Sequence, residues 1–334
     1  MPKNAQWRLA ARPDGLFKPT DFIWHQEDTP PLGEGQVLVQ VVLLSLDPTN
    51  RGWAAGDTYM PAVPIGEVMR GLAVGWVVES HDPRFAPGDA VSGLLGWQRY
   101  AVVAGEALRK LPDVDLPLEA HLALLGHIGL TAWVGLLEIG RPKAGETLVV
   151  SAAAGAVGSL VGQIGKALGL RVVGVVGSEE KCRFITEELG FDAAVNYRKT
   201  IVRAGLRRAC PDGIDVYFDN VGGATLEAAL ALLRNHGRIA LCGLISQYTV
   251  AGSVPGPANL TNLLVRRGRM EGFIVFDHAD KAAQATADLL RWHHEGRLKY
   301  RLDVVEGLEK APVAVNRLFE GANLGKLVVR VAAE

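Results

Sequence analysis

The sequence predicts an α/β fold with two domains, a β-rich first third and a second part in which strands alternate with helices. Its 334 residues are 49% hydrophobic and 21% charged, an ordinary composition for a globular protein and a length sufficient for two cores. Short strands separated by glycine and proline turns fill the first third. From about residue 122, apolar strands alternate with helical stretches, which is typical of a parallel sheet covered on both faces.

The strand-like runs of the first third indicate a β-barrel-like domain. Proline and glycine separate these runs because they end strands and supply the backbone conformations that turns need. The expected strands are 36–46, 72–78 and 90–94, and the turns are Pro30-Pro31, 33–35, Asp82-Pro83 and 87–89.

The second part opens with a helix-rich connection at 122–139 and a loop at 142–146. The tail, 308–331, returns to strand, clearest at 326–331, and is expected to rejoin the first domain. We therefore expect one domain from residues 1–124 and 300–334 and another from 125–299. Strands of the second domain are expected at 148–152, 172–176, 194–197, 214–219, 238–242 and 272–275, with helices between them such as 179–189 and 225–235.

Charge and cysteine content exclude several classes of protein. The net charge is −1 with no long basic run, so a sequence-independent nucleic-acid surface is not expected. Three cysteines without a Cys-x-x-Cys pair indicate a reducing compartment, and we expect a cytoplasmic protein. No apolar segment follows the early charges, so no signal peptide is expected. The uncharged run 148–165 contains four glycines and is better explained as strand, turn and helix than as a membrane span.

A glycine turn joins the strand expected at 148–152 to the helix that follows it. Gly155 and Gly158 permit a tight turn and a close approach of the backbone to a pyrophosphate, and the helix N-terminus offers free N–H groups to the phosphates. The full G-x-G-x-x-G pattern is absent because Ala153 replaces its first glycine. The strand–turn–helix–strand setting favours dinucleotide binding through Gly155, Ala156, Val157 and Gly158; the alternative is a packing turn.

The end of the next strand indicates which dinucleotide binds. NAD enzymes usually place an acidic residue there to bind the ribose, whereas this strand ends in Gly177 and Ser178. Lys181 lies one helical turn later, where a cation suits a 2′-phosphate, so NADP is favoured over NAD. The alternative is that Glu179 and Glu180 are ordinary helix N-terminal charges and Lys181 is a solvated side chain.

These residues lie inside a longer match. The chain resembles the zinc-independent medium-chain dehydrogenases/reductases, specifically the group of leukotriene B4 dehydrogenase, prostaglandin reductase and alkenal double-bond reductase, which is curcumin reductase-like. The resemblance runs from about residue 45 to 326. It is carried by 45–48 with Arg51, 66–71, 131–132, 151–158, 177–178 with 180–182, 196–197, 219–223, 242–243 with 245–246, 272–275 and 323–326.

The resemblance implies NADPH, a GroES-like N-terminal domain, a Rossmann domain with a doubly wound parallel sheet, and a homodimer. It also implies reduction of an activated C=C bond. Taken alone, Tyr197 could be a strand-end aromatic, Phe273 a core residue and Cys242 a buried packing residue. Carried over by position, Lys181 and Tyr197 contact the adenosine 2′-phosphate, and Asn220 lies at the end of its strand near the ribose. The nicotinamide side is lined by the loop 242–248, with Cys242, Gly243, Ile245, Ser246 and Tyr248, and by Phe273, Ile274 and Val275. Asn323 also reaches the cofactor.

Zinc chemistry is not expected. Related zinc alcohol dehydrogenases hold a catalytic metal with cysteine and histidine, but this chain has no cysteine before Cys182. The window 66–71 contains no histidine, and His293 and His294 are adjacent rather than spaced by one helical turn. Without a Lewis acid, a conjugated enone is an easier substrate than a simple ketone, because hydride addition at the β-carbon spreads charge into an enolate.

Few side chains are candidates for donating to the enolate. Tyr59, in a polar loop before the 66–71 segment, and Tyr248 are the candidate substrate-side hydroxyls; the alternative is a surface aromatic in each case. His127 could polarise substrate or be structural. Some relatives have a tyrosine where this chain has Val265, which cannot donate. The proton could come from water or from the ribose hydroxyl, so the acid stays unassigned.

We therefore expect an NADPH-dependent reductase of the C=C bond of α,β-unsaturated aldehydes and ketones, acting on a small molecule by metal-free hydride transfer to the β-carbon. Two alternatives remain. One is a zinc-free NADPH quinone reductase on the same scaffold, and the other is a non-catalytic NADPH-binding protein. Loop side chains decide the natural substrate, and the sequence does not identify it.

Overall fold

The computed structural model describes residues 2–332, which fold into two compact units. Unit 1 contains the chain up to Leu122, then Leu302–Asn323, and the chain from Leu327 onward. Unit 2 contains Ala123–Arg301 together with Leu324–Lys326. The chain therefore passes from one unit to the other more than once near its C-terminal end.

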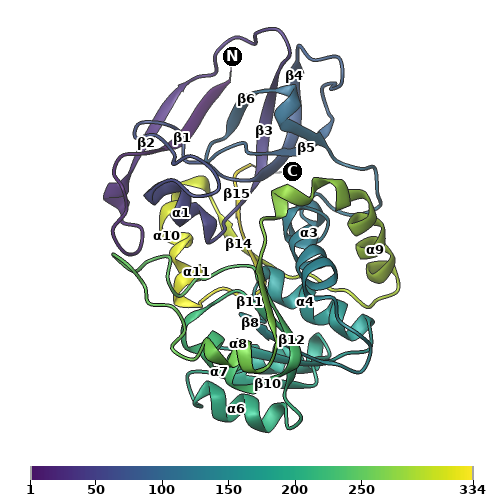
Figure 1. Ribbon diagram of the computed structural model, residues 1–334. Helices are drawn as coiled ribbons and strands as arrows, with labels where there is room; N and C mark the ends of the chain where they lie inside the picture. The colour runs from purple at the N-terminus through teal and green to yellow at the C-terminus, as the bar shows by residue number, and fades with distance from the viewer. Residues whose placement is uncertain (1, 333–334) are drawn as a thin grey trace. The chain divides into compact units, whose positions relative to one another are not determined.

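Unit 1 is built on antiparallel strands (Figure 1). Strands β1 (Lys3–Leu9) and β2 (Phe22–Asp28) form a two-stranded sheet, and a seven-stranded sheet has the order β14-β15-β3-β4-β5-β7, with β6 paired to β3. Strand β3 is central and almost wholly buried, which explains its long apolar run. The remaining strands are β3 (Gln36–Ser45), β4 (Ala73–Ser80), β5 (Ala90–Gly93), β6 (Tyr100–Ala104), β7 (Leu108–Lys110), β14 (Leu302–Glu306) and β15 (Lys326–Arg330).

The tail of unit 1 is partly helical, so the expectation of strand throughout 308–331 is wrong in its first half. Helices α10 (Ala311–Ala314) and α11 (Asn316–Glu320) fill that part, with a proline in the first turn of α10 and Gly321 in the left-handed conformation after α11. Proline is common in the first turn of a helix, and a left-handed glycine is common directly after the last turn. The expected return to strand is confirmed at β15, which pairs antiparallel with β3. Unit 1 also contains α1 (Thr49–Ala55), and α2 (Ala120–Ala123) spans the point in the sequence where unit 1 ends at Leu122.

Unit 2 contains a six-stranded parallel sheet of order β10-β9-β8-β11-β12-β13. Its first strand, β8, lies beside β11, so the chain order reverses there; this is the strand order of dinucleotide-binding sheets. The predicted doubly wound sheet is thus confirmed. The strands are β8 (Thr147–Ser151), β9 (Arg171–Val176), β10 (Ala193–Asn196), β11 (Ile214–Asp219), β12 (Leu233–Leu241) and β13 (Arg269–Gly272).

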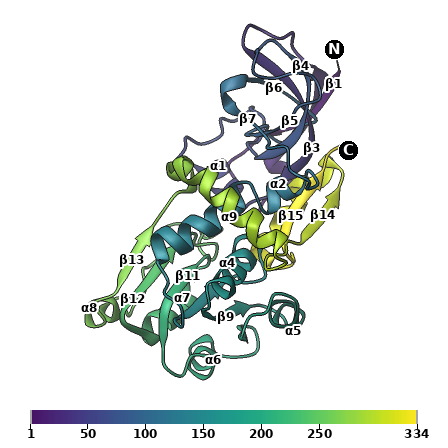
Figure 2. The same ribbon diagram turned by 90° about the vertical axis from the view of Figure 1, so that its right-hand side faces the viewer.

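The helices of unit 2 form two groups that flank this sheet (Figures 1 and 2). Helix α3 (His127–Trp133) packs against α4 (Ala156–Ala167) and α9 (Ala282–His294). Helix α6 (Val202–Ala209) packs against α7 (Gly223–Leu232). The other helical segments are η3 (Val134–Gly140), α5 (Glu179–Arg183), η4 (Phe184–Glu188), α8 (Thr261–Val265) and η5 (Val275–Lys281).

Two strand boundaries differ from the sequence prediction. Strand β12 begins at Leu233, where a helix was expected to continue, and β13 ends at Gly272, where a strand was expected to begin. The ladder between them runs from Arg238 paired with Arg269 to Leu241 paired with Gly272. Strand β13 therefore ends where its partner ends, and the chain after Gly272 is left to form a loop and η5.

One helical stretch, Ala120–Gly140, is long and apolar enough by composition to cross a membrane. About two-thirds of its most apolar window, 67%, is buried inside the protein, as in a core helix. The run 148–165, which also has a low charge, forms strand, turn and helix as expected.

Candidate functional site

The glycine turn at the carboxyl end of β8 has the geometry of a phosphate-binding turn. Strand β8 ends at Ser151, Gly155 caps α4, and the Gly155 amide donates to the Ala152 carbonyl at 2.9 Å. An ideal Cβ on Gly158 would lie 2.5 Å from that same carbonyl oxygen. Glycine is therefore required at 158 for the first turn of the helix to lie against the strand end. Gly155, Ala156, Val157 and Gly158 lie together where the helix presents its first N–H groups.

A segment from the far end of the chain lies beside this turn in unit 2. Gly325 donates its amide to the Ala154 carbonyl at 2.9 Å and forms a parallel bridge with Gly155. Gly325 has φ +79°, and an ideal Cβ there would meet the Arg301 carbonyl oxygen at 2.3 Å. Asn323, the predicted cofactor residue in this region, precedes the segment directly and is buried.

The candidate 2′-phosphate residues gather at the end of β9. Ser178 caps α5, and its hydroxyl accepts the Lys181 amide at 3.1 Å. The Tyr197 amide donates to the Val176 carbonyl at 3.0 Å, which holds the start of the next segment against the end of β9. An ideal Cβ on Gly177 would lie 2.7 Å from the Tyr197 hydroxyl, so the absence of a side chain makes room for the phenol. The structure thus brings the backbones of Lys181 and Tyr197 to one strand end.

The acidic residue at this strand end is already engaged. Asn196 donates to the Glu179 carboxylate at 2.7 Å, and Lys199 lies 3.5 Å from it. The hydrogen bond from Asn196, followed by the charge of Lys199, lowers the pKa of Glu179. The Glu179 carboxylate is therefore already engaged by Asn196 and Lys199, which leaves it less available for the ribose contact that an acidic residue makes in NAD enzymes.

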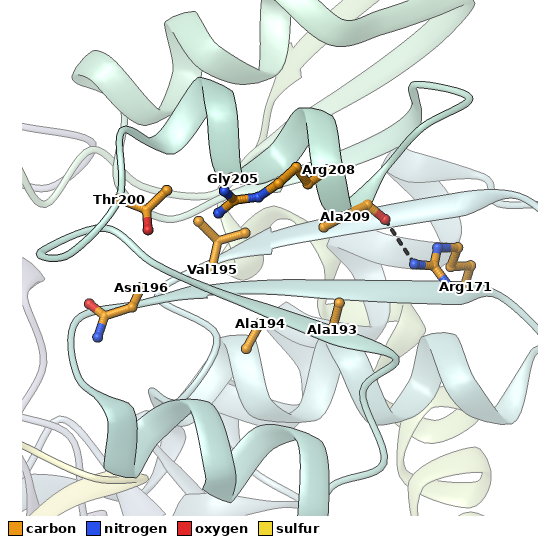
Figure 3. Close-up of a pocket in the computed structure, with 9 residues that line it drawn as sticks. All are labelled: Arg171, Ala193, Ala194, Val195, Asn196, Thr200, Gly205, Arg208 and Ala209. Atoms are coloured by element: carbon orange, nitrogen blue, oxygen red, sulfur yellow. Dashed lines mark hydrogen bonds between the residues drawn. The ribbon is translucent and has the colours of Figure 1, made fainter.

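A pocket of about 290 Å³ lies along the edge strand β10 (Figure 3). The Arg208 side chain extends over Val195, and Arg171 donates to the Ala209 carbonyl at 2.8 Å. Asn196 lines this pocket and is also the residue that donates to the Glu179 carboxylate. None of the predicted cofactor or substrate residues lines this pocket, which is therefore distinct from the site at the glycine turn.

The end of β11 is organised by a buried carboxylate that the sequence reasoning did not single out. Asp219 is 0% exposed, and its Oδ1 accepts hydrogen bonds from Ser151, Tyr217 and the amides of Val221 and Gly222 at 2.8 to 3.0 Å. Burial raises the pKa of Asp219 against the lowering effect of these donors. The signal available was an aspartate that ends an apolar strand and is followed, after two residues, by a pair of glycines.

Asn220 links β11 to the glycine-turn strand. Its amide N–H donates to the Ser151 hydroxyl and its side-chain Nδ2 donates to the Ser151 carbonyl, both at 2.8 Å. Asn220 therefore lies at the strand end, as predicted, and ties the ends of β8 and β11 together.

The predicted nicotinamide-side loop, 242–248, packs on this strand end. The amides of Cys242 and Gly243 donate to the Asp219 carbonyl at 2.9 and 3.1 Å. Ser246 donates its hydroxyl to Val221 at 2.6 Å. Burial, followed by the charge of Asp219, raises the pKa of Cys242 to about 12, so its thiol is a poor nucleophile.

Tyr248 folds back over the same loop. Its hydroxyl accepts the Leu244 amide at 3.0 Å, and the Ile245 amide donates to the Asn220 carbonyl at 3.2 Å. The Tyr248 oxygen lies 3.2 Å from the position of an ideal Cβ on Gly243. The loop residues Cys242, Gly243, Ile245, Ser246 and Tyr248 are thus brought together beside Asn220.

Phe273, Ile274 and Val275 follow β13 and are half-buried. The Phe273 ring lies edge-on to Phe218 with centroids 6.4 Å apart. An ideal Cβ on Gly135 would lie 2.5 Å from the Phe273 ring, so that glycine admits the aromatic side chain. Phe273 is therefore anchored in the core of unit 2, whatever its contact with a cofactor.

Tyr59, the other candidate substrate hydroxyl, belongs to unit 1. It lies in the loop after α1, and its hydroxyl is 2.9 Å from the Thr49 hydroxyl. Its ring is edge-on to the buried Trp53 with centroids 6.4 Å apart. Partial burial raises the pKa of Tyr59, which keeps the phenol protonated.

Two other positions considered from sequence lie in unit 2. His127 begins α3, and its carbonyl accepts the Thr131 hydroxyl at 2.6 Å. Val265 ends α8 and is 58% exposed. Among residues 2–332, no group of three or more histidine, cysteine or acidic side chains could hold a metal ion.

Two family models match the chain. Residues 5–111 match the N-terminal domain of oxidoreductase, and residues 156–292 match zinc-binding dehydrogenase. With the sheet order and the glycine turn, these matches define a medium-chain dehydrogenase/reductase. Within that class, the chain belongs to the family of NADP-dependent reductases that includes curcumin reductase, 2-alkenal reductase and prostaglandin reductase 1.

The relatives match nearly end to end. The chain is 44% identical to NADPH-dependent curcumin reductase of Escherichia coli (strain K12), over 99% of this chain and 98% of that protein. It is 43% identical to the NADP(+)-dependent 2-alkenal reductase of Nicotiana tabacum, over 91% and 90% of the two chains. It is 42% identical to prostaglandin reductase 1 of Rattus norvegicus, over 97% and 98%.

Two solved structures are similar to this chain over nearly its whole length. CurA from Vibrio vulnificus in complex with NADPH has a TM-score of 0.94 and 42% identity, covering 99% of this chain and 100% of that one. A quinone oxidoreductase from Pseudomonas syringae pv. Tomato DC3000, with a TM-score of 0.79 and 24% identity, shares the fold alone.

Proposed function

We propose that this protein is an NADPH-dependent reductase of the C=C bond of α,β-unsaturated aldehydes and ketones. The observation that carries the proposal is the full-length similarity to curcumin, 2-alkenal and prostaglandin reductases, combined with a glycine turn and a strand end suited to NADP. The carboxyl edge of the parallel sheet is where such sheets bind dinucleotides.

The residues at that edge fit NADP. The turn at Gly155 and Gly158 leaves backbone N–H groups of α4 for the pyrophosphate, since a side chain at 158 would displace the helix. Lys181 and Tyr197 would hold the 2′-phosphate, while the Glu179 carboxylate is engaged by Asn196. We assign the remaining contacts to Ala156, Val157, Asn220, Cys242, Gly243, Ile245, Ser246, Tyr248, Phe273, Ile274, Val275 and Asn323.

The chain's own residues would then bind and orient the substrate. When bound, NADPH supplies the hydride that adds to the β-carbon. Tyr59 and Tyr248 are the proposed donors to the carbonyl oxygen, on which negative charge develops as the enolate forms. A protonated phenol at Tyr59 suits that role, because burial disfavours its phenolate. The α-carbon then takes a proton.

NADPH oxidation by the purified protein, measured against 2-alkenals, enones and quinones with product identification, tests this function. The expected product is the saturated aldehyde or ketone. A hydroquinone as the only product would make the protein a quinone reductase instead. Tight NADPH binding without turnover of any 2-alkenal, enone or quinone would make it a non-catalytic binding protein.

We further propose that the protein is a cytoplasmic homodimer, with residues 1–124 and 300–334 serving as substrate domain and 125–299 as NADP-binding domain. The three cysteines are all free, which suits a reducing compartment. Strand β13 is an edge of the parallel sheet, and the neighbouring α8 exposes Leu264 by 78% and Val265 by 58%. An apolar edge of this kind suits pairing with a second copy.

A further inference from the structure

Arg70 is a cation whose surroundings leave most of its hydrogen-bonding capacity unused. Its Nη1 donates to the Pro61 carbonyl at 2.9 Å, and its guanidinium carbon lies 5.5 Å from the centroid of the Trp53 ring. A guanidinium has five N–H groups. Within residues 2–332 no carboxylate lies within ion-pair distance of Arg70, and its other N–H groups make no hydrogen bond to the protein.

Other arginines of unit 1 are satisfied differently. Arg51 is buried, and two of its nitrogens donate to the carbonyls of Gly15 and Pro13 at 2.7 and 2.9 Å. Arg12 donates to the carbonyls of Ala54 and Val63. Arg51 and Arg12 each donate to two backbone carbonyls and so hold loops in place. Arg70 is half-buried and donates to one backbone carbonyl. A half-buried charge without an anionic partner is costly, which suggests a partner that arrives from outside the protein.

Arg70 shares its supporting side chain with Tyr59. Both pack on Trp53, with the Tyr59 and Trp53 ring centroids 6.4 Å apart. The Tyr59 hydroxyl also meets Thr49 at 2.9 Å. Burial raises the pKa of Tyr59 and the charge of Asp47 adds to this, while hydrogen bonding by Thr49 and Trp53 and the charge of Arg70 act to lower it. The surroundings therefore include three groups that favour negative charge at the Tyr59 oxygen.

We propose that Arg70 stabilises the negative charge that develops on the substrate's carbonyl oxygen when that oxygen accepts a hydrogen bond from Tyr59. The inference rests on the proposed function and adds a cation to the hydroxyl donors assigned there. Hydride brings an electron pair to the β-carbon, and the former C=C pair forms the enolate, whose oxygen carries the charge. As the C=O bond reforms, the α-carbon takes a proton from water.

This role predicts a loss of catalysis without a loss of cofactor binding. Arg70→Met keeps much of the apolar stem and removes the charge, and we expect kcat for an enone to fall about 100-fold, the usual scale for removing one oxyanion-stabilising group. The change should fall on kcat more than on KM, because the charge appears in the transition state. Arg70→Lys restores part of the rate, and NADPH affinity by fluorescence titration stays within twofold of the wild type.

Arg109→Met is the matched control, because Arg109 is an exposed arginine of the same unit. It should leave kcat unchanged. If Arg70→Met shows wild-type kcat while the wild type reduces enones, the inference is overturned and the proposed function stands. If the wild type reduces no enone, the proposed function fails first.

A titration gives a readout independent of turnover. The difference in phenolate absorbance between the wild type and Tyr59→Phe reports the pKa of Tyr59 alone. Arg70→Met should raise that pKa, because it removes a charge that favours the phenolate. Arg109→Met should not shift it. An unchanged pKa in Arg70→Met would show that the two side chains are not coupled, which contradicts the proposal.

Discussion

Among single residues, Lys181 has the most specific expected effect. It lies in α5, beside a strand end where the Glu179 carboxylate is engaged by Asn196. A cation in this position can distinguish two cofactors that differ only by a 2′-phosphate. The selectivity should therefore depend on one side chain more than on the shape of the whole site.

We expect Lys181→Ala to weaken NADPH binding about 10- to 100-fold, because a hydrogen bond to a charged group contributes about 1.5–3 kcal/mol. NADH binding should change by less than about twofold, since it has no 2′-phosphate to lose. Fluorescence titration of both cofactors measures this, with the exposed Lys143→Ala as control. Equal losses for NADPH and NADH would rule out the assigned role.

At the residue scale, the sequence allows a prediction where the residues involved are neighbours in the chain. The end of β9, with Ser178 and Lys181, could be read from sequence because strand, cap and cation are neighbours. The acceptor role of Asp219 could not, because its donors Ser151 and Tyr217 lie on two different strands. Arg70 was likewise missed, since only packing on Trp53 shows what surrounds it.

At the scale of elements, the seating of α4 against the end of β8 controls the phosphate turn. Gly158 allows this seating, because any Cβ there would meet the Ala152 carbonyl. The first function of this glycine is thus to fix the helix, and the close approach of a phosphate follows from it.

Gly158→Ala should therefore lower the free energy of unfolding by about 1–3 kcal/mol through overpacking, and weaken NADPH binding about tenfold or more. Gly256→Ala is the control, because nothing lies within 4 Å of a Cβ built there. Thermal unfolding and NADPH titration measure both effects. Matching values for the two variants would contradict the seating argument.

Element positions were predictable wherever an apolar strand had a clear end. Strands β8, β9 and β11 lie close to their expected ranges because each is short, apolar and bounded by glycine or charge. Strand β13 lies before its expected range because pairing with β12 sets its limits. Such pairing is not visible in the local sequence pattern.

For the whole molecule, the expected dimer would bury the edge formed by β13 and α8. Leu264→Glu places a charge in that apolar surface and should convert the dimer to a 35.7 kDa monomer in light scattering coupled to gel filtration. Ile201→Glu is the control, because Ile201 is equally exposed, at 79%, but directly precedes α6, which packs beside the opposite edge strand β10. A wild-type protein that is monomeric at micromolar concentration would refute the dimer.

The two-domain plan could be expected from the sequence, because the short strands before about residue 122 give way there to strands that alternate with helices. The return of the tail to strand was expected from the apolar run at its end, and β15 forms there and pairs with β3. The placement of Leu324–Lys326 in unit 2 could not be foreseen, because it involves contacts such as the bridge between Gly155 and Gly325, which lie far apart in the sequence.

That bridge has a consequence for the order of events during folding. Gly325 pairs with the turn that follows the first strand of the parallel sheet, although the two segments lie far apart in the sequence. Bringing together segments separated by a long stretch of chain costs conformational entropy. A folding intermediate that already contains the helices of unit 2 but has not made this contact lacks one side of its phosphate turn. We therefore expect the turn to reach its final geometry late in folding.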